Sequence, residues 1–111
     1  MKLPSNIVIA EAKLRDYLLT QRSEDDKSGF LALAGYSQTN WRQLESDIRQ
    51  LAGVEEADLI SKSQYGDMYE LKGCLTGPNG KVLYVSAFWI ALEATGETRF
   101  VTLVPDKRSN Q

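Results

Sequence analysis

Four polar side chains in the second half of the chain are of the types that could process a phosphodiester. Lys72, Tyr84, Arg99 and Thr102 supply two cations and two hydroxyl groups. In a metal-independent ribonuclease a cation stabilises the charge of the phosphorane, while a hydroxyl or carboxylate moves protons. These four are the candidate catalytic residues. Arg99 and Thr102 lie on the late strands, and we expect Lys72 and Ser86 near them across the sheet. The simpler interpretation of Arg99 is an ordinary exposed cation on a strand.

The composition removes several kinds of catalytic site. None of the 111 residues is histidine, so the usual general base, the common catalytic dyads and the most frequent zinc ligand are missing. The single cysteine, Cys74, allows no intramolecular disulfide, and we expect it to be a small core residue rather than a nucleophile. Lys and Arg total 13 against 15 Asp and Glu, so the basic excess typical of nucleic-acid binding is absent overall, although a local basic patch stays open.

Three further patterns are better explained by structure than by function. The consecutive acids Glu24, Asp25 and Asp26 suggest Mg²⁺ or Ca²⁺ binding, but adjacent acids seldom converge, so we expect capping and solvation, no metal and no cofactor. The segment 77–80, "GPNG", is a turn with no helix after it to bind phosphate. Aromatic residues at strand spacing suggest base stacking, yet core and cross-strand pairs are favoured for Tyr65, Tyr69, Tyr84, Phe88 and Trp89.

These candidates must be positioned by the elements that the hydrophobic pattern predicts. Up to about Gly53 the apolar residues recur at helical spacing, which predicts three helices. The first places Leu14 and Leu18 on one face with Ala10 and Tyr17. The second is short, capped by Asp25 or Asp26 and stopped by Gly35. The third has an apolar stripe of Trp41, Leu44, Ile48 and Leu51. For this third helix we expect Thr39 as N-cap and Gly53 as the end, with Arg42, Glu45 and Arg49 on a solvated face.

From Glu56 onward the residues alternate as in strands. Two hairpins follow, with turns at 77–80 and 93–98, and Gly80 is expected to form a bulge. Apolar residues on both sides of the segment 82–92 predict a strand that is at least partly covered on both faces. The fold class is therefore α+β, with three N-terminal helices packed on a four-stranded antiparallel β-meander. One domain is expected over residues 1–106, followed by a polar tail over 107–111.

The sequence resembles an uncharacterised bacterial family, domain of unknown function 6883. The matching pieces are "MKLP", "AKLRDYLL", "DKSGFLALAGYS", "NW", "YG", "GPNGK", "SAFWI" and "RFVTLVP", in this order over nearly the whole chain. The resemblance implies a likeness to C-terminal modules of bacterial conflict proteins, whose layout is that of the barnase, EndoU, colicin and RelE-like ribonucleases. It also singles out recurrent polar or special residues, here Lys27, Tyr65, Gly66, Gly77, Pro78, Gly80, Trp89, Arg99, Thr102 and Pro105.

The chain departs from the family pattern at two places. Where relatives commonly have His-Pro-x-Gly before the position of Lys27, this chain has "SEDD". Where they tend to have tyrosine before the final proline, it has Val104. The lost histidine and the acidic loop weaken a catalytic interpretation.

Two functions follow from these observations. The favoured one is a non-enzymatic protein-interaction module of a conflict or accessory system, binding a protein partner or itself. The alternative is a metal-independent ribonuclease-like toxin module that acts on RNA. The N-terminus lacks a full signal-peptide core and no segment approaches membrane-spanning length, so we expect a cytoplasmic protein without membrane contact.

Overall fold

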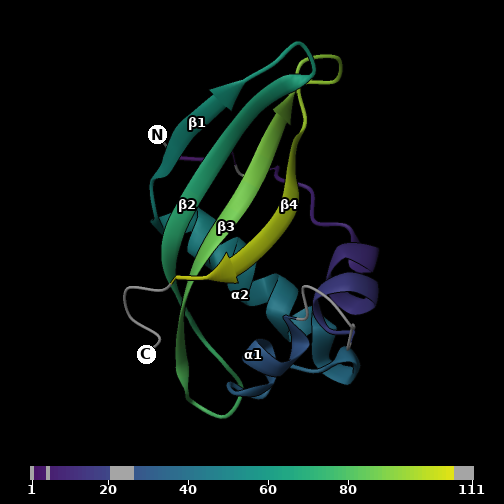
Figure 1. Ribbon diagram of the computed structural model, residues 1–111, viewed down its shortest axis with the longest axis vertical. Helices are drawn as coiled ribbons and strands as arrows, with labels where there is room; N and C mark the ends of the chain where they lie inside the picture. The colour runs from purple at the N-terminus through teal and green to yellow at the C-terminus, as the bar shows by residue number, and fades with distance from the viewer. Residues whose placement is uncertain (1, 5, 21–26, 107–111) are drawn as a thin grey trace.

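The computed structural model describes residues 2–4, 6–20 and 27–106, which Figure 1 traces as one sheet with helices behind it. All four strands belong to a single antiparallel sheet whose order follows the chain. They are β1 (Ala57–Lys62), β2 (Gly66–Thr76), β3 (Val82–Leu92) and β4 (Thr98–Pro105). The α+β class and the meander are thus confirmed. Within the described residues, no helix is both long and apolar enough to cross a bilayer.

The helical part is smaller than the predicted three packed helices. It consists of a π-helix (Lys13–Leu18), α1 (Ser28–Ala32), a 3-10 turn (Gln38–Asn40) and α2 (Trp41–Val54). Of these, α2 packs against β2 and the π-helix touches β4. Because α1 has only five residues, the layer behind the sheet is formed mainly by one long helix. The expected cap of the second helix at Asp25 or Asp26 lies outside the described residues.

The apolar stripe of α2 is buried as predicted, but both of its ends differ from the prediction. Leu44 and Ile48 are almost fully buried, because side chains three and four positions apart share one helix face. At the start, the N-cap of α2 is Asn40 and not Thr39, and the Asn40 side chain forms a reciprocal capping box with Ser37 around the preceding 3-10 turn. At the end, α2 continues through Gly53. The spacing signal therefore located the helix, while its first and last residues depend on the 3-10 turn before it and on the chain after Gly53.

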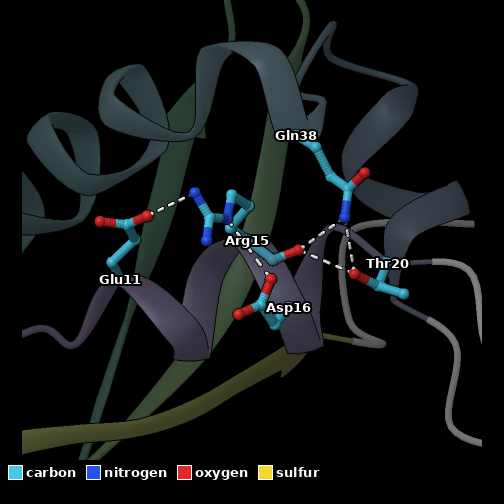
Figure 2. A network of polar contacts seen from close by, with 5 residues as sticks. All are labelled: Glu11, Arg15, Asp16, Thr20 and Gln38. Atoms are coloured by element: carbon cyan, nitrogen blue, oxygen red, sulfur yellow. Dashed lines mark hydrogen bonds and ion pairs between the residues drawn. The ribbon is translucent and has the colours of Figure 1, made fainter.

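The π-helix is joined to the 3-10 turn through one backbone carbonyl. Figure 2 shows the Arg15 carbonyl accepting hydrogen bonds from Thr20 Oγ1 at 2.7 Å and Gln38 Nε2 at 3.0 Å. The side chain of Arg15 pairs with Glu11 at 2.6 Å. Because a π-helical turn leaves carbonyls out of the regular α-helical pattern, side chains can satisfy them. This contact fixes the π-helix, which carries Tyr17, relative to the start of α2.

The two faces of the sheet differ in burial. On the face toward α2, which we call the inner face, the odd-numbered positions of β3 are buried: Leu83, Val85, Ala87 and Trp89. Trp89 meets Phe100 of β4 edge to face, with ring centroids 5.3 Å apart. The opposite or outer face is mixed: Ser86 is buried, Phe88 is half-buried and Tyr84 is 42% exposed. The predicted cover on both faces of this strand is only partial on the outer one.

The turn at 77–80 forms as predicted and is also held by a distant segment. Gly80 has a φ of 88°, in the left-handed region that a bulge after a tight turn requires. A Cβ at Gly77 would lie 2.1 Å from the carbonyl oxygen of Ala34, so only glycine fits there. Asn79 donates through its side chain to the Leu33 carbonyl at 3.0 Å. The hairpin therefore docks on the end of α1.

The two edges of the sheet differ in how far their backbone groups are hydrogen-bonded. On the β4 side, Val8 donates to the Thr98 carbonyl and accepts from the Phe100 N–H, at 2.9 and 2.8 Å, so the chain's beginning covers that edge. On the other side, β1 pairs with β2 only as far as Leu71. Residues 72–76 of β2 extend beyond it. Within the part of the chain that the structure describes, no strand pairs with this stretch on that side.

Candidate functional site

The four candidate catalytic residues occupy separate places along the sheet. By register, Arg99 lies opposite Ile90, Thr102 opposite Phe88, Lys72 opposite Ser86 and Tyr84 opposite Cys74. Lys72 and Ser86 thus face each other, whereas the partners of Thr102 and Arg99 lie two and four positions further along β3 than Ser86. Tyr84, Ser86 and Ile90 are even-numbered positions of β3, so Tyr84, Lys72 and Arg99 belong to the outer face. Thr102 lies at the register shift beside Phe88 and Trp89, where this alternation is interrupted.

The spacing along β3 keeps the candidates apart. Tyr84 and the Arg99 partner Ile90 are six residues apart on β3, a separation of about 20 Å at strand rise. Arg99 has its own nearby carboxylate, Glu97, at 3.5 Å. Arg99, Lys72 and Tyr84 therefore do not form one compact positive centre.

Thr102 belongs to a different cluster that also contains a buried lysine. Lys27, only 8% exposed, donates to the Tyr17 hydroxyl at 3.1 Å and reaches Thr102 Oγ1 at 3.5 Å. The ammonium also lies 5.0 Å from the centre of the Tyr17 ring, a cation–π contact. The three side chains come from the π-helix, from the residue before α1 and from β4. The cluster thus combines a cation with two hydroxyl groups.

The chemistry available to this Lys27 cluster is charge stabilisation and proton transfer. A lysine ammonium can stabilise negative charge that develops on a phosphate, and a hydroxyl beside it can carry a proton. The same arrangement also satisfies a buried lysine structurally, because its stem is apolar and its head is hydrogen-bonded. Sequence spacing could not find the cluster, since Lys27 and Thr102 are 75 positions apart. The family resemblance alone singled out both residues.

Two further predictions concern acids and thiols. Glu24, Asp25 and Asp26 lie outside the described residues, and among the residues the structure describes no three metal-ligating side chains gather. Cys74 is exposed, so its expected place in the core is wrong. The reason is register: Cys74 pairs with Tyr84 on the outer face, whereas its neighbours Gly73 and Leu75 point toward α2.

A buried tyrosine that follows α1 is hydrogen-bonded to both α2 and β2. Tyr36, 1% exposed, donates to the Asp47 carboxylate at 2.5 Å and lies 3.4 Å from the Thr76 carbonyl. Burial raises the pKa of Tyr36 well above its usual range, and the hydrogen bond to Asp47 and its negative charge raise it further. A phenol that stays neutral serves as a donor in the structure. Asp47 accepts a second hydrogen bond from Gln43 at 3.0 Å.

Beside this junction a pocket of about 260 Å³ opens between α2 and the unpaired part of β2. Its α2 wall carries Asp47, Gln50, Leu51, Val54 and Glu55, and its β2 wall carries Cys74, Leu75 and Thr76. Sequence analysis missed this site. No motif marks it, because the pocket exists only where β1 stops short of the end of β2.

Comparison with known proteins identifies the family of this chain and a solved structure of similar fold. The sequence model of the family "Domain of unknown function (DUF6883)" matches residues 2–107. The chain belongs to this family. No protein with a curated description matches it. A solved structure, "Contact-dependent growth inhibition toxin - immunity protein complex from Klebsiella pneumoniae 342", contains a chain with 22% identity and a TM-score of 0.69, covering 89% of this chain and 99% of that one. At that identity the likeness concerns the fold.

The DUF6883 match confirms the resemblance seen in the sequence and helps to sort the residues that it singled out. Some are structural: Gly66 has no room for a Cβ beside the Ala91 carbonyl, and Trp89 is fully buried. Others are polar and clustered, namely Lys27 and Thr102. Tyr84 occupies a cross-strand position opposite Cys74, in line with the expected cross-strand pairs, but it is 42% exposed. Tyr65 is 70% exposed, so it is not the core residue that was expected.

Proposed function

We propose that this DUF6883 domain acts in a bacterial conflict system by binding a protein partner. The observation that carries the proposal is the fold it shares with a chain of a toxin–immunity protein complex over almost the whole of both chains. In such a complex either component is held by the other, so a protein-binding surface suits both roles. The toxin role and the immunity role are distinguished by whether expression of this chain arrests growth.

Surface composition supports protein binding. Seven large apolar side chains are exposed by 42–70%: Leu33, Val54, Leu59, Ile60, Tyr65, Val82 and Tyr84. Several of them lie on β1, on the loops and on the outer face of the sheet rather than on the helix-covered face. Exposed apolar and aromatic groups beside an unpaired strand edge are typical of docking surfaces. The acidic balance of the chain favours a partner with basic character over nucleic acid.

The test is co-purification of the tagged chain from its own host after chemical cross-linking, with mass spectrometry and sizing of the complex. We expect one partner in a fixed stoichiometric ratio, or a defined self-association. A strict monomer in light scattering together with no cross-linked partner would contradict the proposal.

A second candidate, a metal-independent ribonuclease-like toxin, is favoured by the Lys27 cluster. In this candidate Lys27 stabilises the phosphorane and Thr102 or Tyr17 relays a proton, while Lys72, Tyr84 and Arg99 contact RNA along the outer face. Without histidine, a lysine or an arginine must supply the cation, and Lys27 is the cation that lies beside two hydroxyl groups. The cluster's position on the β4 side differs from that of the α2–β2 pocket, so one domain could carry both a partner site and a reactive site.

Induced expression distinguishes the two candidates. The ribonuclease candidate predicts growth arrest and RNA cleavage that persists in EDTA, with both lost in Lys27→Met and Thr102→Val. The exposed turn residue provides a control, since Lys81→Met should arrest growth like the wild type. Abundant, harmless expression of the wild type with intact cellular RNA would reject the ribonuclease and leave the binding module.

A further inference from the structure

We propose that the unpaired edge of β2 at residues 72–76 takes up an extended, basic segment of a partner protein as an additional strand. This inference rests on the proposed function, because it specifies where the partner binds and what chemistry it presents. Three observations carry it: the direction of the backbone groups, the pocket beside them and the charge of that pocket.

The backbone of this stretch is oriented for strand addition. Gly77 donates its N–H to the Lys81 carbonyl, so position 77 faces β3. Since the hydrogen-bonding direction alternates along a strand, Lys72, Cys74 and Thr76 direct their N–H and C=O groups to the other side. The Thr76 carbonyl accordingly lies 3.4 Å from the Tyr36 hydroxyl. Within the described residues the N–H and C=O of Cys74 have no partner on that side.

The pocket gives an added strand somewhere to place its side chains. The 260 Å³ space runs between this edge and the flank of α2, with Leu51, Leu75 and the 61%-exposed Val54 supplying apolar surface. Alternate side chains of a strand at this edge would point to the inner-face side and enter the pocket. The pocket is small, so it suits one or two long side chains.

The charge of the pocket selects basic side chains. Asp47 and Glu55 line it, and no lysine or arginine does. Within the described residues the Glu55 carboxylate has no ion-pair partner, and its Cγ would lie 3.1 Å from a Cβ at Gly73, so this side chain lies over the strand. A Lys or Arg stem can pack on Leu51 and Val54 while its cationic head meets these carboxylates.

The other edge of the sheet, at β4, is partly occupied by the segment around Val8. On the β4 side the hydrogen bonds of Val8 with Thr98 and Phe100 occupy the strand edge over its first residues. Edge strands that stay open usually carry a device against indiscriminate pairing. Here Glu55 and Asp47 supply one, because an incoming strand with acidic side chains would be repelled from the pocket.

The test uses a displayed library of random ten-residue peptides selected on the intact domain. We expect enriched peptides with Lys or Arg at alternate positions; each is then synthesised with a fluorescent label for polarisation measurements. Cys74→Pro removes the outward N–H and places a ring at the edge, while the ladder to β3 is retained. Affinity for this variant should fall about tenfold or more, because one backbone donor is lost and the proline ring obstructs the approach of the added strand. Cys74→Ala, which keeps the backbone, should bind like the wild type.

The charge of Glu55 and the hydrogen exchange of the Cys74 amide provide two further tests of the proposed binding site. Glu55→Gln should weaken binding about two- to fivefold, as expected for one ion pair near the surface, and Glu55→Lys should reverse the preference to acidic peptides. Hydrogen exchange on the wild type should show slowed exchange of the Cys74 amide when peptide is bound, a measurement that needs no variant. The absence of enriched peptides, equal binding to a folded Cys74→Pro variant, or an unprotected Cys74 amide would overturn the proposal.

The partner cross-linked in its host separates this inference from the proposed function. If wild type and Cys74→Pro retain the same partner equally well, the β2 edge is refuted while the binding function stands. If no partner is found but basic peptides bind at the edge, the edge site stands and the conflict-system function fails.

Discussion

The Tyr36 hydroxyl donates a 2.5 Å hydrogen bond to the Asp47 carboxylate and so ties the segment after α1 to α2. Because the same hydroxyl lies 3.4 Å from the Thr76 carbonyl, this one phenol also contacts the last residue of β2. Both of its partners, Asp47 and Thr76, line the pocket into which we place side chains of the partner strand.

Tyr36→Phe should lower the free energy of unfolding at neutral pH by about 1–2 kcal/mol, since a hydrogen bond to a charged acceptor is removed. The pH profile should also change. The pKa of Tyr36 is raised in the folded chain, so its stabilising effect is complete below the unfolded value near 10 and is lost as the pH rises beyond it. Urea titrations between pH 8 and about 11.5 should therefore show a steeper loss of stability for wild type than for the variant.

The control for this titration is Tyr65→Phe, because Tyr65 is 70% exposed. Its pH profile should remain parallel to that of the wild type. Equal slopes for wild type and Tyr36→Phe would show that the phenol is not held neutral by the fold.

Gly77→Ala should destabilise the domain by about 2–4 kcal/mol. A Cβ at this position meets the backbone carbonyl of Ala34 at 2.1 Å and its Cβ at 2.4 Å, and neither can move without displacing the end of α1. Gly53→Ala is the matched control of opposite sign, because nothing lies within 4 Å of its Cβ and alanine favours a helix. We expect a gain of about 0.5 kcal/mol in thermal or urea unfolding. A tolerated Gly77→Ala would mean that the hairpin does not dock on α1.

Arg49→Met should cost about 1–2 kcal/mol, although Arg49 was predicted to be a solvated residue. Its guanidinium donates to the Ile7 carbonyl at 2.9 Å and pairs with Glu45 at 3.0 Å. Methionine keeps the apolar stem and removes both contacts. Glu45→Gln removes only the charge of the pair and should cost less than about 0.5 kcal/mol. Equal costs in urea unfolding would assign the effect to the ion pair and not to the bond that holds residues 7–9 beside β4.

Much of the fold was predictable because its signals are local. The spacing of Leu44, Ile48 and Leu51 located α2, and the turn chemistry around Gly80 located the hairpin between β2 and β3. The meander followed, since short turns leave antiparallel neighbours. The start of α2 was harder to predict, because Ser37, Thr39 and Asn40 are all competent N-caps; Ser37 caps the 3-10 turn and Asn40 precedes α2.

The candidate sites were only partly predictable. From the sequence, Thr102 was grouped with Arg99, and Lys72 and Ser86 were expected beside them, whereas the register opposes Lys72 to Ser86 and the Thr102 hydroxyl lies in a cluster of other members. Its lysine neighbour is not Lys72 but Lys27, which comes from the other end of the chain. Cys74 was assigned to the core because its flanks are apolar, while the register of β2 turned it outward.

By itself, the sequence determined an α+β domain with one strong amphipathic helix, a four-stranded meander and no histidine chemistry, because periodicity, turn residues and composition act over a few neighbouring positions. Only the tertiary structure decided which distant groups meet: Lys27 with Tyr17 and Thr102, Gly77 with Ala34, and the flank of α2 with the free edge of β2. The physical reason is that such contacts depend on where each strand stops pairing and on which face each register exposes. A one-residue shift in the pairing of two strands would change both the end of the pairing and the exposed face, without changing the sequence pattern of either strand.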